Sequence, residues 1–352
     1  MKALVLSGGA GTRMRPAGYP LPRQLVPIAN KPVLEYVLEN LRDIGITEIG
    51  VVVGENGSEI IEMFGDGAVL GVSLTYLDQD FALGVAHCVK IARPFLGDDD
   101  FVLYLGDYVL TDGIGQIADE FARLRPSAQV LVDKVEDPRL YGVAEVDENS
   151  RVTRLIEHPR EPRSDLAMIG VYFFTPAIHV AIDSIEPSWR GQFEITDALQ
   201  WLVTHERDVR ARIYSGFWKD TGKVEDVLEC NRELLMGLRG DVQGIVDDES
   251  RLIGDVVVEE GARVVRSCIV GPAIIGPGTL VEESIIGPYV SIGADCRITE
   301  SGVADSIVLS EASVHNVSGI ETSLIGRRAR VGSAGRHRLV VGDGAHVDVA
   351  AA

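Results

Sequence analysis

Residues 4–13 read LVLSGGAGTR, a short apolar run followed by a glycine-rich loop that carries an arginine. The apolar run predicts a strand buried inside an α/β sheet. Glycine allows backbone N–H groups to approach an anion closely, and Arg13 adds a forked cation that can bind the same group. Because open α/β sheets bind ligands at the carboxyl ends of their strands, the stretch predicts a triphosphate site there.

The glycine loop by itself also fits an ordinary turn between a strand and a helix. It is not a P-loop, because no Gly-Lys-Ser/Thr follows it. Its glycines are also closer together than those of the Rossmann G-x-G-x-x-G pattern. Other parts of the sequence are therefore needed to distinguish a phosphate site from an ordinary turn.

Short apolar runs alternate with segments of helical periodicity across residues 1–240. This alternation predicts a mostly parallel sheet that is covered by helices on both faces. The expected strands are residues 2–6, 48–53, 73–77, 101–105, 128–132 and 166–174. The expected helices are residues 33–42, 59–64, 85–92, 115–124, 195–205 and 224–235.

A different pattern begins after about residue 245, where single aliphatic residues recur roughly every six positions between Gly, Pro, Asp and Ser. Such a repeat is typical of a parallel β-helix, in which each short face contributes one inward aliphatic side chain. Steps of five and an irregular stretch over residues 310–322 interrupt the pattern, and a β-sandwich is the alternative. We expect domains over residues 1–240 and 241–352, a linker over residues 236–249, and a homo-oligomer.

The formal net charge is −20, so the chain lacks the basic surface that binds nucleic-acid polymers. The four cysteines, Cys88, Cys230, Cys268 and Cys296, form no C-x-x-C pair, which argues against a zinc site. The sequence contains neither a signal-peptide pattern nor an apolar run long enough to cross a membrane. We therefore expect a cytoplasmic protein without a membrane partner.

Two carboxylates stand where strands are expected to end. Asp107 follows the apolar run 103–105, and Asp220 lies in a turn before the helix expected at residue 224. Two carboxylates suit Mg²⁺, which prefers oxygen ligands and keeps its other positions for water and phosphate. Each residue alone also fits a turn or a helix cap, and the sequence does not show that the two meet.

The glycine loop continues as Arg13-Met14-Arg15-Pro16 and is followed by Arg23-Gln24-Leu25-Val26-Pro27 and Asn30-Lys31-Pro32. This series resembles the signature of the sugar-1-phosphate nucleotidyltransferases, above all the long glucose-1-phosphate thymidylyltransferases with a C-terminal extension. The resemblance covers nearly all of residues 1–235 through six motifs in order. It implies a Rossmann-like, mostly parallel nucleotidyltransferase domain followed by a left-handed β-helix of hexapeptide repeats.

The resemblance also implies roles for individual residues. The metal ligands would be Asp107 and Asp220, and the catalytic cations would be Arg13, Arg23 and His158. The nucleotide would contact Leu6, Gly8, Gly9, Gly11, Thr12, Gln24, Gln79 and Gly84. The sugar phosphate would contact Tyr108, Gly142, Glu157 and Glu194. For Glu194 the competing explanation is an acidic residue in the first turn of a helix, which the helix dipole favours.

Three departures from the family pattern matter most: Arg23 and His158 replace lysines, and Tyr108 replaces an asparagine. Arginine and lysine are not equivalent at a tight phosphate site, and histidine is only partly charged near neutral pH. Tyr108 adds bulk and a phenol close to the expected sugar. These departures suggest either an unusual phosphate-bearing acceptor or a loss of activity.

The reaction implied by the resemblance is in-line attack of a sugar 1-phosphate oxygen on the α-phosphorus of a nucleoside triphosphate, with Mg²⁺ and loss of pyrophosphate. dTTP and glucose 1-phosphate are the expected substrates, with a cyclitol phosphate or another base as alternatives. A non-catalytic homologue that binds a nucleotide or a sugar nucleotide is a second possibility. A third is an acyltransferase in the β-helix that uses His315, His337 or His346.

Overall fold

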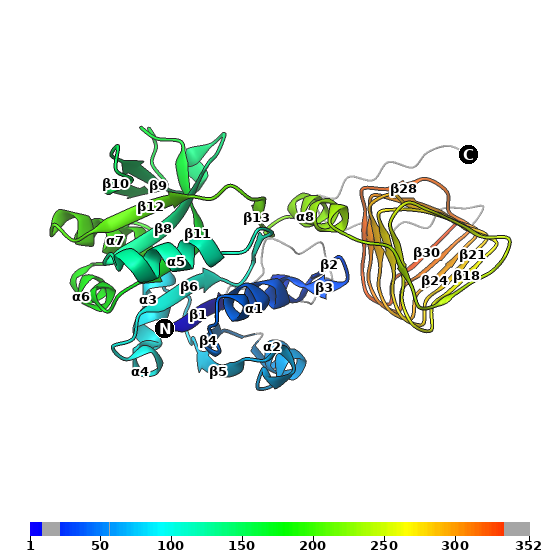
Figure 1. Ribbon diagram of the computed structural model, residues 1–352, viewed down its shortest axis with the longest axis horizontal. Coiled ribbons are helices and arrows are strands. Elements are labelled where there is room, and N and C mark those ends of the chain that lie inside the picture. Colours follow the sequence, from blue (N-terminus) through cyan, green and yellow to red (C-terminus); the bar gives the residue numbers. More distant parts are fainter. Residues whose placement is uncertain (9–21, 56, 334–352) are drawn as a thin grey trace. The chain divides into compact units, whose positions relative to one another are not determined.

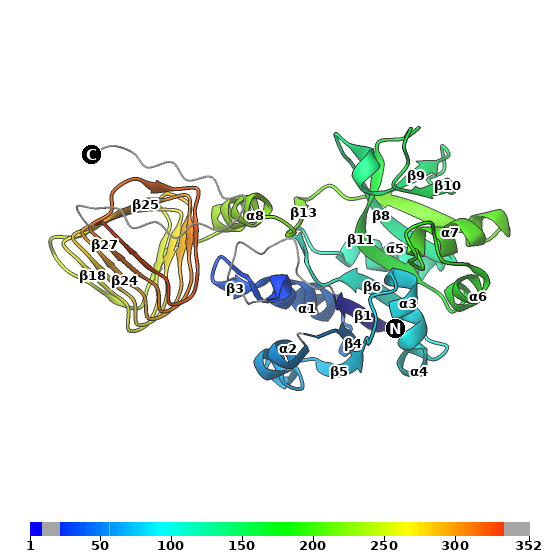
Figure 2. The same ribbon diagram turned by 180° about the vertical axis from the view of Figure 1, so that it is seen from behind.

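The computed structural model describes residues 1–8, 22–55 and 57–333, and it is shown from two sides in Figure 1 and Figure 2. The described residues divide into two compact units. The first unit contains residues 1–8 and 33–220, and the second contains residues 22–32 and 221–333. Within these residues, none of the helices has the length and apolar character needed to span a membrane.

The centre of the first unit is a sheet with the strand order β10-β9-β11-β6-β1-β4-β5. In addition, β8 pairs with β11, and β12 pairs with β8. Its parallel part consists of β1 (Lys2–Ser7), β4 (Glu48–Val53), β5 (Ser73–Asp78) and β6 (Phe101–Leu105). The apolar run that opens the chain is thus paired on both sides, with β4 and β6. The predicted α/β sheet is confirmed.

The other half of this sheet is mostly antiparallel. β11 (Leu166–Phe174) pairs antiparallel with β6, with β8 (Ala128–Lys134) and with β9 (Gly142–Val146). β10 (Val152–Glu157) pairs antiparallel with β9, and β12 (Val209–Ile213) pairs parallel with β8. The sheet is therefore mixed, and three of these strands, β9, β10 and β12, were not predicted.

Helices cover both faces of the sheet. Successive strand residues point to opposite faces: the Phe174 ring packs 5.4 Å from Phe101, while the Phe173 ring packs 5.4 Å from Phe121 of the helix α5. The helices α3, α6 and α7 contact one another and share the core cluster that contains Phe174. The helices of this unit are α1 (Val33–Asp43), α2 (Gly57–Phe64), α3 (Val85–Ile91), α4 (Arg93–Leu96), α5 (Gly115–Leu124), α6 (Ala177–Ser184) and α7 (Ile195–Thr204). Of these, α4 and α6 were not predicted.

The second unit begins with a single helical turn at Arg23–Leu25 and the short hairpin of β2 (Pro27–Ile28) and β3 (Lys31–Pro32). The helix α8 (Val224–Met236) contacts β2. Short parallel strands then form three sheets, whose coils stack as a three-sided prism (Figure 2). The predicted β-helix is confirmed.

One coil of this β-helix spans 17 residues, because Val256, Ala273 and Val290 pair in successive coils. The buried residues Ile269, Ile275, Val281 and Ile286 follow one another at steps of six, six and five, which add up to one coil. The steps of five are thus part of the repeat. The strands are β14 (Asp241–Val242), β15 (Ile245–Val246), β16 (Arg251–Ile253), β17 (Val256–Val258), β18 (Arg263–Val265), β19 (Cys268–Val270), β20 (Ala273–Ile275), β21 (Leu280–Glu282), β22 (Ile285–Ile286), β23 (Val290–Ile292), β24 (Arg297–Thr299), β25 (Gly302–Ala304), β26 (Ile307–Val308), β27 (Ser313–His315), β28 (Ile320–Glu321), β29 (Leu324–Ile325) and β30 (Arg330–Gly332).

Two predictions about this region were wrong. The segment expected to be a linker already contains β14 and β15, which pair with later coils. The stretch over residues 310–322 is not irregular, because β27 and β28 continue the ladders there. Gly and Asp in the first segment and polar residues in the second concealed the inward aliphatic positions.

Candidate functional site

A two-stranded ladder brings the two carboxylates predicted to bind metal to the same tyrosine, Tyr108. β7 (Tyr108–Leu110) pairs antiparallel with β13 (Trp218–Asp220), and this register places Asp220 directly opposite Tyr108. Asp107 immediately precedes Tyr108 in the chain and is only 4% exposed. Burial, and then the nearby charges of Asp220 and Asp107, raise the pKa of the Tyr108 phenol well above its usual range. The structure therefore brings both carboxylates to the same tyrosine.

This arrangement fits a magnesium ion. In proteins Mg²⁺ is usually held by one or two carboxylates and completes its shell with water and substrate phosphates. Asp107 and Asp220 supply two carboxylates from separate strands, and among the described residues no group of three or more His, Cys, Asp or Glu side chains forms a closed metal cage. The residues thus fit a metal that shares its ligands with a bound nucleotide.

The ring of Tyr108 is held in place by its neighbours. It stacks on Trp218 with 6.1 Å between ring centroids and 2° between ring planes, and Tyr141 meets Trp218 edge-on at 5.9 Å. A Cβ atom at Gly170, whose φ is +78°, would lie 2.9 Å from the Tyr108 ring. Trp218 is itself anchored, because its Nε1 donates a hydrogen bond of 2.6 Å to Asp133. Tyr108 is therefore a fixed wall of the site.

Three of the residues predicted to contact the nucleotide lie around the end of β1. Leu6 is buried within β1, and Gly8 follows that strand. A Cβ atom at Gly8 would lie 2.6 Å from Oε1 of Gln79, so the glutamine amide lies over the first residue of the glycine loop. Gly84 has a φ of +105°, and a Cβ atom there would lie 2.5 Å from the backbone oxygen of Phe193.

The residues predicted to contact the sugar phosphate also come together. Thr196 donates a 2.5 Å hydrogen bond to Glu157 Oε2, and a Cβ atom at Gly142 would lie within 3 Å of both groups. Ser188 donates a 3.0 Å hydrogen bond to Glu194. Burial, and then the charge of Glu157, raise the pKa of the Glu194 carboxyl. The cluster presents carboxylate oxygens, which can accept hydrogen bonds from hydroxyl groups.

His158 lies beside this acidic cluster in a left-handed backbone conformation with φ of 45°. Its Nδ1 is 3.0 Å from the backbone oxygen of Arg139, and its Nε2 is 3.2 Å from Glu157 Oε1. Both neighbours are hydrogen-bond acceptors, so the ring can bind both only when each nitrogen carries a proton. The two ring nitrogens of His158 thus face two acceptors, and one of these is the carboxylate of Glu157.

Arg190 was not predicted from the sequence as a site residue. Its Nη1 lies 3.6 Å from Glu157 Oε1 and 3.7 Å from Glu194 Oε1, so a full cation stands between the two carboxylates. The one available signal was its place four residues before Glu194, and this spacing does not indicate Glu157. Arg190 provides a permanent positive charge near the position where the family has a lysine and this chain has His158.

Several predicted site residues are not placed relative to this cluster. Arg23 and Gln24 belong to the second unit, where Gln24 is 1% exposed within the single turn Arg23–Leu25. Gly9, Gly11, Thr12 and Arg13 lie outside the described residues, as do His337 and His346. His315 is described: its Nδ1 lies 2.8 Å from the Thr299 hydroxyl within the β-helix.

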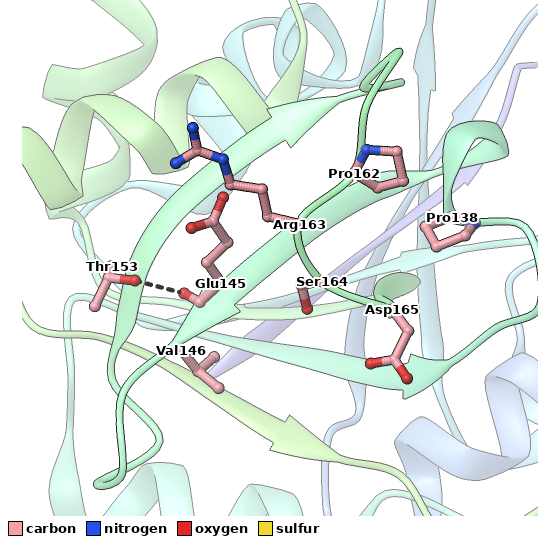
Figure 3. Close-up of a pocket in the computed structure, with 8 residues that line it drawn as sticks. All are labelled: Pro138, Glu145, Val146, Thr153, Pro162, Arg163, Ser164 and Asp165. Atoms are coloured by element: carbon pink, nitrogen blue, oxygen red, sulfur yellow. Dashed lines mark hydrogen bonds between the residues drawn. The ribbon is translucent and has the colours of Figure 1, made fainter.

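A separate hollow of about 660 Å³ is lined in part by the β9–β10 hairpin (Figure 3). It is lined by Pro138, Glu145, Val146, Thr153, Pro162, Arg163, Ser164 and Asp165. None of the site residues predicted from the sequence lines this hollow, and the side chains that line it are all at least partly exposed. The predicted site residues that the structure describes in the first unit are therefore elsewhere, around β1, β7, β13 and the acidic cluster.

Comparison with known proteins identifies the family. The family model for nucleotidyl transferases matches residues 2–237. The chain is 49% identical to a glucose-1-phosphate thymidylyltransferase of Streptomyces antibioticus over 99% of both chains, and 50% identical to that of Streptomyces griseus over 97% of this chain and 98% of the relative. A solved structure from Bacillus anthracis, assigned to the same enzyme type, has a TM-score of 0.63 at 30% identity and covers 68% of this chain and 97% of its own. The chain belongs to the nucleotidyl transferase family.

Proposed function

We propose that this enzyme transfers a thymidylyl group from dTTP to glucose 1-phosphate and releases pyrophosphate. The observation that carries the proposal is the ladder that places Asp220 opposite Tyr108, the residue that follows Asp107, in a chain of this family. The two Streptomyces relatives, both named glucose-1-phosphate thymidylyltransferases and aligned over almost the whole chain, support these substrates.

The metal in this proposal is Mg²⁺, held by Asp107 and Asp220. Bound there, it would neutralise charge on the triphosphate. The protein holds Asp107 just after the end of β6, where the side chain is almost fully buried and its orientation is fixed by the packing around it. Tyr108 and Trp218 keep the two strands, and hence the two carboxylates, in register.

In the transfer, a phosphate oxygen of the sugar 1-phosphate forms a bond to the α-phosphorus while the bond to pyrophosphate breaks. The attacking oxygen is already ionised, so catalysis requires positioning and charge neutralisation rather than a strong base. We assign the cations to Arg13, Arg23 and His158, and we add Arg190 because it lies within ion-pair distance of the acidic cluster.

Substrate binding is divided between two sets of residues. Glu157 and Glu194 would accept hydrogen bonds from sugar hydroxyls, with Gly142 and Tyr108 forming the adjoining wall. The nucleotide would contact Leu6, Gly8, Gly9, Gly11, Thr12, Gln24, Gln79 and Gly84. We further propose residues 1–240 as the transferase domain, residues 241–352 as an assembly module of a homo-oligomer, and a cytoplasmic location.

The test is pyrophosphate release with Mg²⁺ across a matrix of nucleoside triphosphates and sugar 1-phosphates, with product masses measured. We expect the highest kcat/KM for dTTP with glucose 1-phosphate and a product with the mass of dTDP-glucose. A different best pair would replace the proposed substrates. Nucleotide binding without release for any pair, cyclitol phosphates included, would contradict the proposed function and favour a non-catalytic homologue.

A further inference from the structure

The side chain of Gln79 is the end of a short hydrogen-bond chain that starts on helix α3. Its backbone N–H donates to Val53 on β4 at 2.8 Å, which fixes the start of the side chain. Its side-chain Nε2 donates to Sγ of Cys88 at 3.1 Å. The Cys88 thiol in turn lies 3.5 Å from the backbone oxygen of Gly84 and donates to it. This series of hydrogen bonds thus connects Gln79 and Gly84, two residues that we assign to nucleotide binding.

Cys88 is suited to this place because it keeps its proton. Its side chain is 5% exposed, and burial raises the pKa of its thiol to about 12. A protonated thiol donates one hydrogen bond, here to Gly84, and its sulfur accepts another, here from Gln79. The thiol therefore favours the amide orientation in which nitrogen, and not oxygen, faces helix α3.

This orientation leaves the amide oxygen on the other side. Oε1 lies over Gly8, so close that a Cβ atom there would be 2.6 Å away. Within the described part of the chain, no donor is hydrogen-bonded to Oε1. An acceptor is thus presented beside the first residue of the glycine loop, where we place the nucleotide.

We propose that Cys88 is a positioning residue that sets base selection, because it holds Nε2 of Gln79 and so presents Oε1 to the base. Thymine and uracil carry an N3–H donor on the edge that such an acceptor binds. Cytosine carries an unprotonated ring nitrogen there, which repels the acceptor. This inference rests on the proposed function only in assuming that Gln79 contacts the base.

The experiment compares the binding of dTTP and dCTP by calorimetry, and their kcat/KM with glucose 1-phosphate, in the wild type and three variants. Cys88→Ala removes the sulfur acceptor, and Cys88→Ser keeps a donor and an acceptor at the site. Cys296→Ala is the matched control, since it removes a buried thiol of the β-helix. Thermal unfolding of each variant checks the fold, and Cys88→Val replaces alanine if that variant is unstable.

We expect Cys88→Ala to lower the preference for dTTP over dCTP about fivefold, the effect of losing one orienting hydrogen bond. The change should appear in Kd and KM with kcat nearly unchanged, because Gln79 faces the base and not the reacting phosphates. Cys88→Ser should recover most of the preference, and Cys296→Ala should not alter it.

An unchanged preference in Cys88→Ala, or an equal loss for both nucleotides, would overturn the proposal and leave Cys88 a packing residue. Because calorimetry measures the binding of dTTP and dCTP directly, the test of Cys88 does not depend on turnover. If the wild type binds dTTP more tightly than dCTP but makes no product, the proposed function fails and the role of Cys88 is still decided by the binding ratios. Equal binding of the two nucleotides by the wild type would also overturn it.

Discussion

The buried polar groups of the β-helix and those of the α/β unit are satisfied in different ways. In the β-helix, Ser250, Ser267, Ser284 and Ser301 recur every 17 residues, and the hydroxyl of each of the first three accepts a hydrogen bond of 3.0 Å from the backbone N–H of the next serine. In the α/β unit, Glu157 depends on Thr196, His158 and Arg190, which follow no period. Because the serines recur at a fixed spacing, the first pattern can be recognised in the sequence. The contacts of Glu157 join segments that become neighbours only in the folded protein.

The largest expected effect concerns the non-periodic site. Asp220→Asn removes one of the two carboxylates on the β7–β13 ladder, and we expect kcat for Mg²⁺-dependent pyrophosphate release to fall about 10²–10³-fold. Asp183→Asn is the matched control, because this aspartate pairs with Arg93 on the surface. Wild-type turnover in Asp220→Asn would mean that another residue holds the metal.

The next effect concerns the repeat. Ile286 and Ile285 are neighbours on β22, but Ile286 is fully buried and Ile285 is 63% exposed. We expect Ile286→Ala to lower the free energy of unfolding by about 2–5 kcal/mol and Ile285→Ala by less than about 0.5 kcal/mol. Denaturant unfolding measures both. Equal losses would show that the inward and outward positions are wrongly assigned.

A smaller effect is expected at Arg190. Arg190→Ala removes the cation between Glu157 and Glu194, and KM for glucose 1-phosphate should rise about 10- to 100-fold, as for a lost charge-assisted hydrogen bond. Arg163→Ala, in the hollow of Figure 3, provides the control and should behave as the wild type. If both variants bind the sugar phosphate normally, Arg190 only stabilises the acidic cluster.

The next effect concerns the serines that recur every 17 residues in the β-helix. Ser284→Ala leaves the backbone N–H of Ser301 without its acceptor, so we expect the free energy of unfolding to fall by about 1–3 kcal/mol. Thermal unfolding at two protein concentrations separates this loss from any change in assembly. No loss at all would indicate that water or another group replaces the hydroxyl.

The smallest effect concerns pH. Burial and Glu157 raise the pKa of Glu194, so as the pH falls this carboxylate takes up a proton sooner than an ordinary glutamate. Proton uptake removes an acceptor, so KM for glucose 1-phosphate should begin to rise on acidification above the usual glutamate range, and Glu194→Gln should lose this limb. The same raised pKa makes ionised Glu194 destabilising for the fold, and this cost is relieved as the pH falls. An identical acid limb in the variant would assign it to another group.

Much of the fold could be predicted because its signals are local. The strand around Leu4, the helix at residues 115–124 and the aliphatic period of the β-helix all follow from patterns within a few residues. The short strands β9 and β10 were missed because their residues alternate between buried and exposed only in part. They are strands because β9 pairs with β11 and β10 pairs with β9.

The site was predicted as a set of residues and not as a geometry. Asp107 and Asp220 are 113 positions apart, and only the pairing of β7 with β13 makes them neighbours. Arg190 and Cys88 were missed as site residues for the same reason: their partners, Glu157 and Gln79, belong to other elements. Motifs identify residues whose type matters, whereas long-range pairing decides which of them meet.

The measurement that tests the central claim most directly is Mn²⁺ binding followed by electron paramagnetic resonance, with dTTP present, in the wild type and in an Asp107→Asn/Asp220→Asn variant. The free Mn²⁺–dTTP signal should fall as wild-type protein is added and should persist with the variant at the same concentration. Equal loss of the free signal for both proteins, with dTTP bound by both, would contradict a metal site on the β7–β13 ladder.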